Sequence, residues 1–185
     1  MIHEWRRYRL KAGMAQPYLQ LLADRGLPLV TRHLPLMGYW LAESGELNVI
    51  HHLWSYDSWS AREAARRALA TDTDWSQGFI PQAFAMVEAQ KNCFLRLTAG
   101  SPAFDAALSQ RHRPDGLSHS AQDLFAPLCA AMVEGEAPEA AVACFSPLSG
   151  AGAKRALLCR NADPLAAGPQ GAGHVILRPL GFSPL

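Results

Sequence analysis

The sequence predicts an α+β fold built from two tandem ferredoxin-like repeats, the second of them degenerate. The first 98 residues alternate strand and helix patterns in the order β-α-β-β-α-β, which is the ferredoxin-like plan. An internal repeat extends the plan to the rest of the chain. Leu95-Arg96 followed by Ser101-Pro102 recurs as Leu177-Arg178 followed by Ser183-Pro184, at a constant offset of 82 residues. The alternative is a C-terminal extension that packs on a single ferredoxin-like domain.

The first repeat, residues 1–98, contains four strands and two helical regions. Its strands are rich in β-branched and aromatic residues, and its helices carry apolar residues at helical spacing. Gly26 and Pro28 interrupt the first helical stripe, and Asp57 or Ser58 caps the Ala-rich second helix, whose arginines are expected to face water. The expected elements are strands at Ile2–Leu10, Leu36–Ala42, Asn48–Tyr56 and Met86–Leu97, a helix from Pro17 to Arg25, a short helix to His33, and a helix after Ser58.

The second repeat, residues 99–185, is expected to be shorter than the first. Ser44-Gly45 of the first hairpin corresponds to Ser149-Gly150 at an offset of 105, so 23 residues are missing before the last strand. In the first repeat that interval holds the Ala-rich helix, so the second repeat is expected to lack its second helix. The expected elements are an irregular strand at Phe104–Arg113, a helix at Ser118–Val133, a hairpin of Ala140–Pro147 with Lys154–Arg160, and a last strand at His174–Leu180.

Two adjacent histidines, His51 and His52, are the most suggestive residues for function. Because side chains alternate along a strand, they must point to opposite faces of the sheet. A hairpin centred near Gly45 places Trp40 across from one of them. One face then carries Asn48, Ile50, His52, Trp54 and Tyr56, and the other carries Val49, His51, Leu53 and Ser55.

Several stretches of the first repeat resemble the NIPSNAP family. They are Gly26-Leu-Pro-Leu with Arg32-His33, Met37-Gly38-Tyr39-Trp40, Gly45-Glu46-Leu47-Asn48, and His52-Leu53-Trp54-Ser55-Tyr56-Asp57-Ser58. The resemblance implies the dimeric α/β-barrel superfamily, in which two antiparallel ferredoxin-like sheets face each other around a shared core. It implies no activity and carries over no catalytic residue set.

These observations predict a module that binds a small molecule or a protein, or that acts as a scaffold, without a cofactor. The alternative is a cofactor-independent or haem-dependent monooxygenase that uses a pocket between the first sheet and its helices. Two histidines that face apart cannot jointly bind a metal, and a purely structural role also explains each of them. Candidate catalytic residues are His52, Asn48, Trp54 and His51, and candidate ligand-binding residues are Trp40, Tyr39 and Tyr56. For Arg62, Arg66 and Arg67, a solvated helix face is favoured over an anion site.

The composition argues against some classes of partner. A net charge of +1 gives no general attraction to nucleic acid, and no run reaches the ~18 apolar residues of a membrane-spanning helix. The N-terminus shows no apolar signal segment, so we expect a cytoplasmic protein with four reduced cysteines. Cys144 and Cys159 are expected to lie opposite each other.

The lost helix would uncover apolar strand surface near Leu157 and Leu158. Such an uncovered surface predicts a homodimer, and a small apolar ligand is the other expected partner.

Overall fold

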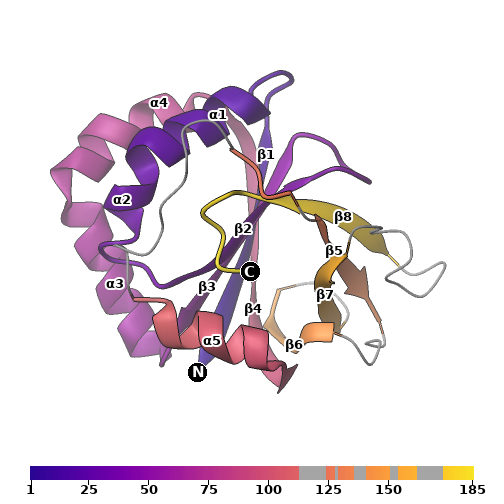
Figure 1. The fold of residues 1–185 in the computed structure, drawn as a ribbon. Helices are drawn as coiled ribbons and strands as arrows, with labels where there is room; N and C mark the ends of the chain where they lie inside the picture. The colour runs from indigo at the N-terminus through magenta and orange to yellow at the C-terminus, as the bar shows by residue number, and fades with distance from the viewer. Residues whose placement is uncertain (113–123, 128, 136–140, 151–153, 162–172) are drawn as a thin grey trace.

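Eight antiparallel strands close into a single barrel (Figure 1). The computed structural model describes residues 1–112, 124–127, 129–135, 141–150, 154–161 and 173–185. The strands are β1 (Ile2–Leu10), β2 (Leu36–Ala42), β3 (Val49–Tyr56), β4 (Val87–Gly100), β5 (Cys129–Glu134), β6 (Ala141–Ser149), β7 (Arg155–Asn161) and β8 (His174–Pro179). Their order around the barrel is β1-β3-β2-β8-β5-β7-β6-β4. The predicted fold class is confirmed as a mixed α/β, antiparallel barrel, and the barrel closes within one chain through the β2–β8 and β4–β6 pairs.

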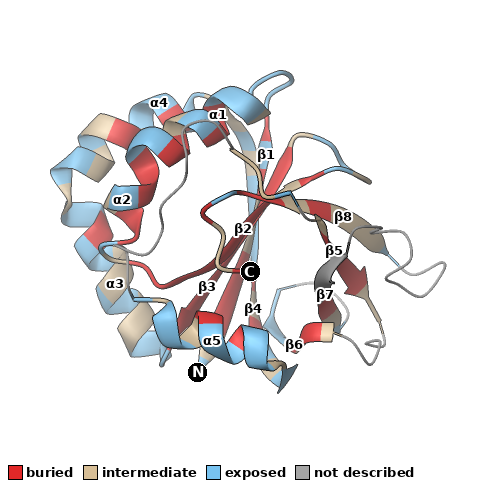
Figure 2. Ribbon diagram, viewed as in Figure 1, coloured by how far each residue is buried: buried red, intermediate tan, exposed pale blue. Residues whose placement is uncertain are grey.

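The helices are concentrated on the first half of the barrel. They are α1 (Ala15–Leu21), α2 (Leu27–Val30), α3 (Trp59–Thr71), α4 (Ile80–Phe84) and α5 (Pro102–Gln110), with π-helical segments η1 (Leu22–Gly26) and η2 (Asp74–Phe79). Figure 1 shows α1 to α4 on the outside of the sheet formed by β1, β2 and β3, and α5 across one end of the barrel. The strands under these helices are largely buried, whereas the outer helix faces are exposed (Figure 2).

The first-half strands largely follow the predicted pattern. β1 and β2 have the predicted bounds, and Ser58 caps α3 by accepting a hydrogen bond from the Ala61 backbone N–H. Pro28 does not break the first helical region, because it lies in the first turn of α2, where a missing N–H costs nothing. The region therefore continues through η1 and ends at Val30 rather than His33.

One irregularity in β2 changes which residues share a face. The register against β3 shifts between Leu36 and Gly38, so Leu36 packs under the helices whereas Trp40 points into the barrel. A β-bulge of this kind reverses the alternation, so Leu36 and Trp40 lie on opposite faces of the sheet although both positions are even. A Cβ on Gly38 would lie 2.0 Å from the Trp40 ring, so glycine is needed for the indole to fold over the backbone.

The second half differs from the prediction at its start. Phe104–Arg113, predicted as a strand, is mostly helix α5, which Ser101 caps by accepting from the Phe104 N–H. Ser118–Val133, predicted as a helix, ends in strand β5, while its residues 118–123 lie outside the described residues. The following strand order, β8-β5-β7-β6, matches the order β4-β1-β3-β2 of the first half.

The β6–β7 hairpin corrects the cysteine prediction. Cys144 pairs with Ala156, not with Cys159, whose side chain lies outside the described residues. Cys93, Cys129 and Cys144 are free thiols. Ala156 and Leu157 are buried within this single chain. These two residues are therefore not part of an uncovered apolar patch of the kind on which the homodimer prediction rests.

Two main apolar cores result from this architecture. The barrel interior is filled by residues such as Trp5, Trp40, Leu53 and Phe145, and α5 contributes Phe104 to it. The second core lies between α1 to α4 and the outer face of β1, β2 and β3. In the part of the chain that the structure describes, no helix is long and apolar enough to cross a membrane.

Candidate functional site

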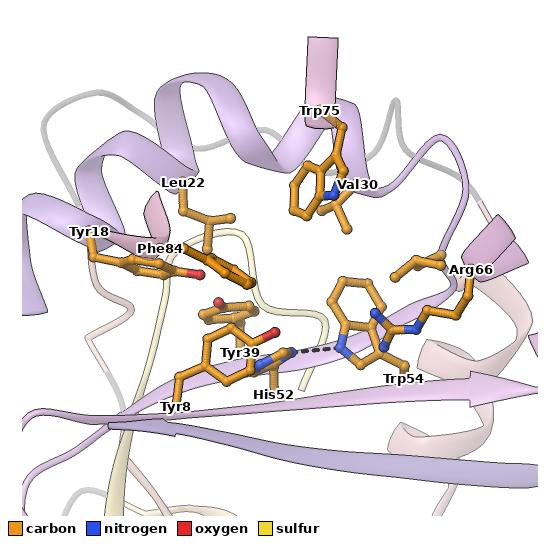
Figure 3. A pocket seen from close by; sticks show the side chains of 11 residues that line it. Tyr8, Tyr18, Leu22, Val30, Tyr39, His52, Trp54, Arg66, Trp75 and Phe84 are labelled. Carbon is orange, nitrogen blue, oxygen red and sulfur yellow. Dashed lines mark hydrogen bonds between the residues drawn. The ribbon is translucent and has the colours of Figure 1, made fainter. Parts of the chain in front are cut away.

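A small pocket lies between the first-half sheet and its helices (Figure 3). Its volume is about 30 Å³, enough for one or two water-sized groups. β1, β2 and β3 contribute its floor, and the helices contribute its roof and rim. The residues that matter most for its chemistry are Tyr8, Tyr18, Tyr39, His52, Trp54 and Arg66.

His52 occupies the centre of the floor. Its ring stacks on Tyr39 with 4.8 Å between ring centroids and meets the Tyr8 ring edge-on at 4.7 Å. Its Nδ1 accepts a hydrogen bond of 2.6 Å from the Trp54 indole N–H (Figure 3). Because a neutral imidazole carries one proton, this bond places the proton on Nε2. That Nε2 is buried and has no hydrogen-bond partner among the described residues.

His52 is held as a neutral hydrogen-bond donor. Burial lowers its pKa well below the usual value, and the positive charges of Arg6 and Arg66 lower it further, outweighing the opposite effect of Glu4. At neutral pH the ring therefore presents a fixed N–H rather than a group that exchanges protons. Such a donor can bind a carbonyl oxygen or an anion, but it is not poised as a general acid or base.

A buried carboxylate, Glu4, binds three arginines, one of which, Arg66, lines the pocket. Its oxygens accept hydrogen bonds from Arg6 at 2.9 Å, from Arg62 at 3.0 and 3.1 Å, and from Arg66 at 3.0 Å. Asn92 donates a further bond of 3.3 Å. Burial alone would raise the Glu4 pKa, but the Arg62 hydrogen bonds and the arginine charges lower it to about 2. Arg62 and Arg66 were predicted to face water, and that prediction is wrong.

The helical roof has unusual local geometry. Both helical regions above the pocket contain a π-helical segment, η1 with Leu22 and η2 with Trp75 on the pocket lining. Single-turn π segments inside helices are frequent at functional sites. The two segments approach closely, because a Cβ on Gly26 would lie 2.5 Å from the Phe79 ring.

The structure divides the predicted site residues between two compartments. His52, Trp54 and Tyr39 line the pocket, and Tyr56 lies on the same face of β3 without lining it. His51 pairs with Trp40 as predicted, but Trp40 points into the barrel, and His51 Nδ1 accepts from the Trp5 indole at 3.1 Å. These two residues therefore do not reach the pocket.

Asn48 is not part of the site. It precedes β3 in a turn with φ of +57°, a left-handed conformation that asparagine tolerates, and its carbonyl accepts from the Leu10 N–H. The alternation that puts it on the His52 face holds only inside the strand, so its predicted membership of the site is wrong.

Sequence reasoning missed Tyr8, Tyr18 and Glu4, and it favoured a solvated helix face for Arg66. The alternation of β1 does carry a signal, because Glu4 shares the parity of Tyr8 and Leu10, which marks a charge in a buried row. Arg62, Ala65, Arg66 and Leu69 follow helical spacing along the inner face of α3, which the alanine pattern obscured. Among the described residues, no three His, Cys, Asp or Glu side chains are grouped to hold a metal ion.

Comparison with known proteins assigns the first half of the chain. The NIPSNAP family profile matches residues 3–102. Human protein NipSnap homolog 3A is 32% identical over 93 residues, and mouse protein NipSnap homolog 3B is 33% identical over 90 residues. These matches cover 50% and 48% of this chain, but only 37% and 36% of those proteins.

Solved structures agree with this assignment. An uncharacterized NIPSNAP domain protein from Burkholderia xenovorans is 38% identical, with a TM-score of 0.52, and Atu4242 from Agrobacterium tumefaciens is 34% identical, with a TM-score of 0.53. The matches cover 55% of this chain but 99% and 98% of theirs, so each of those chains is matched almost entirely by about half of this one. With a family match over more than half of its residues, this chain belongs to the NIPSNAP family.

Proposed function

We propose that this protein is a small-molecule binding module whose ligand is held in the pocket over His52. One observation carries the proposal: the His52 Nε2–H is a buried donor without a partner among the described residues, and His52 is one of the residues that line the cavity. A buried donor left without an acceptor costs about 1–3 kcal/mol, so an acceptor supplied by a ligand recovers that free energy.

The enzyme alternative has weaker support. Pockets for cofactors and drug-sized ligands occupy roughly 300–1,000 Å³, so a cavity of about 30 Å³ does not fit a haem. The lowered pKa of His52 also argues against a proton-transfer role at neutral pH. The aromatic lining of the pocket suits a binding site as well as it suits the active site of an enzyme.

The adjacent histidines provide a matched pair of variants for the test. A library of small polar molecules is titrated into the protein while NMR follows the indole N–H signal of Trp54. We expect molecules that shift this signal in wild type to lose binding in His52→Gln and to keep it in His51→Gln, which alters the opposite face. If no molecule binds, or if both variants bind equally well, the proposal is overturned.

We also propose that residues 1–98 and 99–185 are repeats of one ferredoxin-like unit. The matching strand order of the two halves supports this, as does the correspondence of Leu95-Arg96 on β4 with Leu177-Arg178 on β8. In this proposal the second half completes the barrel that two separate copies would form. A homodimer of the whole chain stays a prediction, for which light scattering at tens of micromolar is the measurement.

A further inference from the structure

The polar groups that surround the pocket are rich in hydrogen-bond donors. Besides His52 Nε2, the Nε atom of Arg66, which also lines the pocket, is buried without a partner among the described residues. The same holds for the Nε atom of Arg6, which does not line the pocket but binds Tyr8, a lining residue. The Tyr8 hydroxyl accepts a bond of 3.1 Å from Arg6, so its own proton is available to an acceptor. Figure 3 shows Tyr8, His52 and Arg66 around the same space.

The charges of this region do not balance. Arg6, Arg62 and Arg66 all bind Glu4, and Arg62 also contacts the exposed Glu63 at 2.7 Å. Within the described part of the chain, Arg6 and Arg66 form no ion pair with another carboxylate. Three guanidinium groups thus share two carboxylates, and one positive charge remains in excess. Burial is the main cause of the lowered pKa of His52, and the charges of Arg6 and Arg66 lower it further, in line with the excess positive charge on this side of the sheet.

The ligand must therefore be an acceptor and an anion, and it must be small. We propose that the pocket binds the carboxylate group of a small monocarboxylic acid, with one oxygen accepting from His52 Nε2–H and the other directed to the Arg66 guanidinium. This inference rests on the proposed function and specifies the ligand of the same site. It replaces the small apolar ligand expected from the sequence. Charge-assisted hydrogen bonds to a carboxylate are about twice as strong as neutral ones, which favours this group over an amide or an alcohol.

The test compares acetate with acetamide, which match in size and differ in charge. Both are titrated into the full-length protein at matched ionic strength, while NMR follows the Trp54 indole and the His52 Nε2–H. We expect acetate to bind at least tenfold more tightly than acetamide and to shift the His52 Nε2–H signal downfield. Inorganic phosphate forms a third arm, and we expect it to bind more weakly than acetate.

Two arginine variants localise the binding. Arg66→Gln should weaken acetate binding at least tenfold, whereas Arg67→Gln, an exposed neighbour on the same helix, should change it less than twofold. Circular dichroism checks that both variants fold, and the comparison of acetate with acetamide in wild type needs no variant.

The outcomes separate the two proposals. Equal binding of acetate and acetamide overturns the carboxylate inference and leaves the binding module standing. Tighter binding of phosphate than of acetate also overturns it, in favour of a different oxyanion. If acetate causes no shift while other small molecules from the library do, only the ligand class is wrong. If nothing binds at this site, both proposals fail.

Discussion

Replacing Glu4 with glutamine should destabilise the protein strongly at neutral pH and hardly at all in acid. Glu4 is completely buried in the middle of β1, and its carboxylate is the shared partner of Arg6, Arg62 and Arg66. Glutamine keeps the shape of the side chain but removes the charge, so three guanidinium groups lose their common counter-ion. Removing one partner of a buried ion pair is costly because the other charge stays buried.

The pKa of Glu4 sets the magnitude of the effect. Folding lowers this pKa from 4.5 to about 2, because the Arg62 hydrogen bonds and the charges of Arg66 and Arg6 outweigh the cost of burial. At 1.36 kcal/mol per pKa unit, the ionised carboxylate contributes about 3 kcal/mol to the free energy of unfolding. Because the folded pKa is the lower one, this stabilisation is complete above pH 4.5 and is lost as the pH falls towards 2.

Urea unfolding of wild type and Glu4→Gln between pH 2 and pH 7 measures this contribution. We expect a difference of about 3 kcal/mol at pH 7 that shrinks progressively below pH 4.5. Glu63→Gln is the matched control, because Glu63 also binds Arg62 but is exposed, and its loss should cost less than about 1 kcal/mol. A Glu4→Gln difference no larger than that of the control, or one independent of pH, would refute the role assigned to Glu4.

Three further predictions concern packing and the barrel. Gly38→Ala should lower the free energy of unfolding by about 1–3 kcal/mol and weaken the near-ultraviolet circular dichroism of the tryptophans, because its Cβ would overlap the Trp40 ring; an unchanged spectrum and stability would contradict this. Gly26→Ala should also destabilise, although alanine favours a helix, since the new methyl group would overlap Phe79; a gain in the melting temperature would show that the two π-helical segments can separate. Residues 1–98 expressed alone should aggregate or form a homodimer, because Trp40 and the rest of the barrel face would be uncovered; a well-behaved monomer in light scattering would count against this.

The parts of the fold that follow from local pattern were predictable, and those that depend on distant contacts were not. The alternation along β3 correctly separates His51 from His52, since it is a property of the strand itself. β5, with the sequence Cys-Ala-Ala-Met-Val-Glu, reads as helical because alanine and methionine favour a helix. It is a strand because β7 and β8 pair with it on both sides, which no local pattern reveals.

Helix α5 is a different kind of error. Ser101 followed by Pro102 is a strong signal for a helix start, and Phe104 with Ala107 and Leu108 gives helical spacing. The strand expectation rested on the proposed repeat rather than on this local pattern. For the candidate pocket, the predicted residues Tyr39, His52 and Trp54 are near one another in β2 and β3, whereas Tyr8, Tyr18 and Arg66 come from separate elements and converge only in the folded chain.

The two adjacent histidines show why the site belongs to the helix side of the sheet. Each accepts an indole N–H at Nδ1, His51 from Trp5 inside the barrel and His52 from Trp54 under the helices. Both rings are buried, and burial lowers the pKa of His51 to about 3 and that of His52 well below its usual value, so both are neutral donors at Nε2. For His52, but not for His51, the remote nitrogen is buried without a partner among the described residues, and the residue lines a cavity. The same indole–imidazole arrangement therefore serves packing on one face of β3, and on the other it presents a donor to which a ligand can bind.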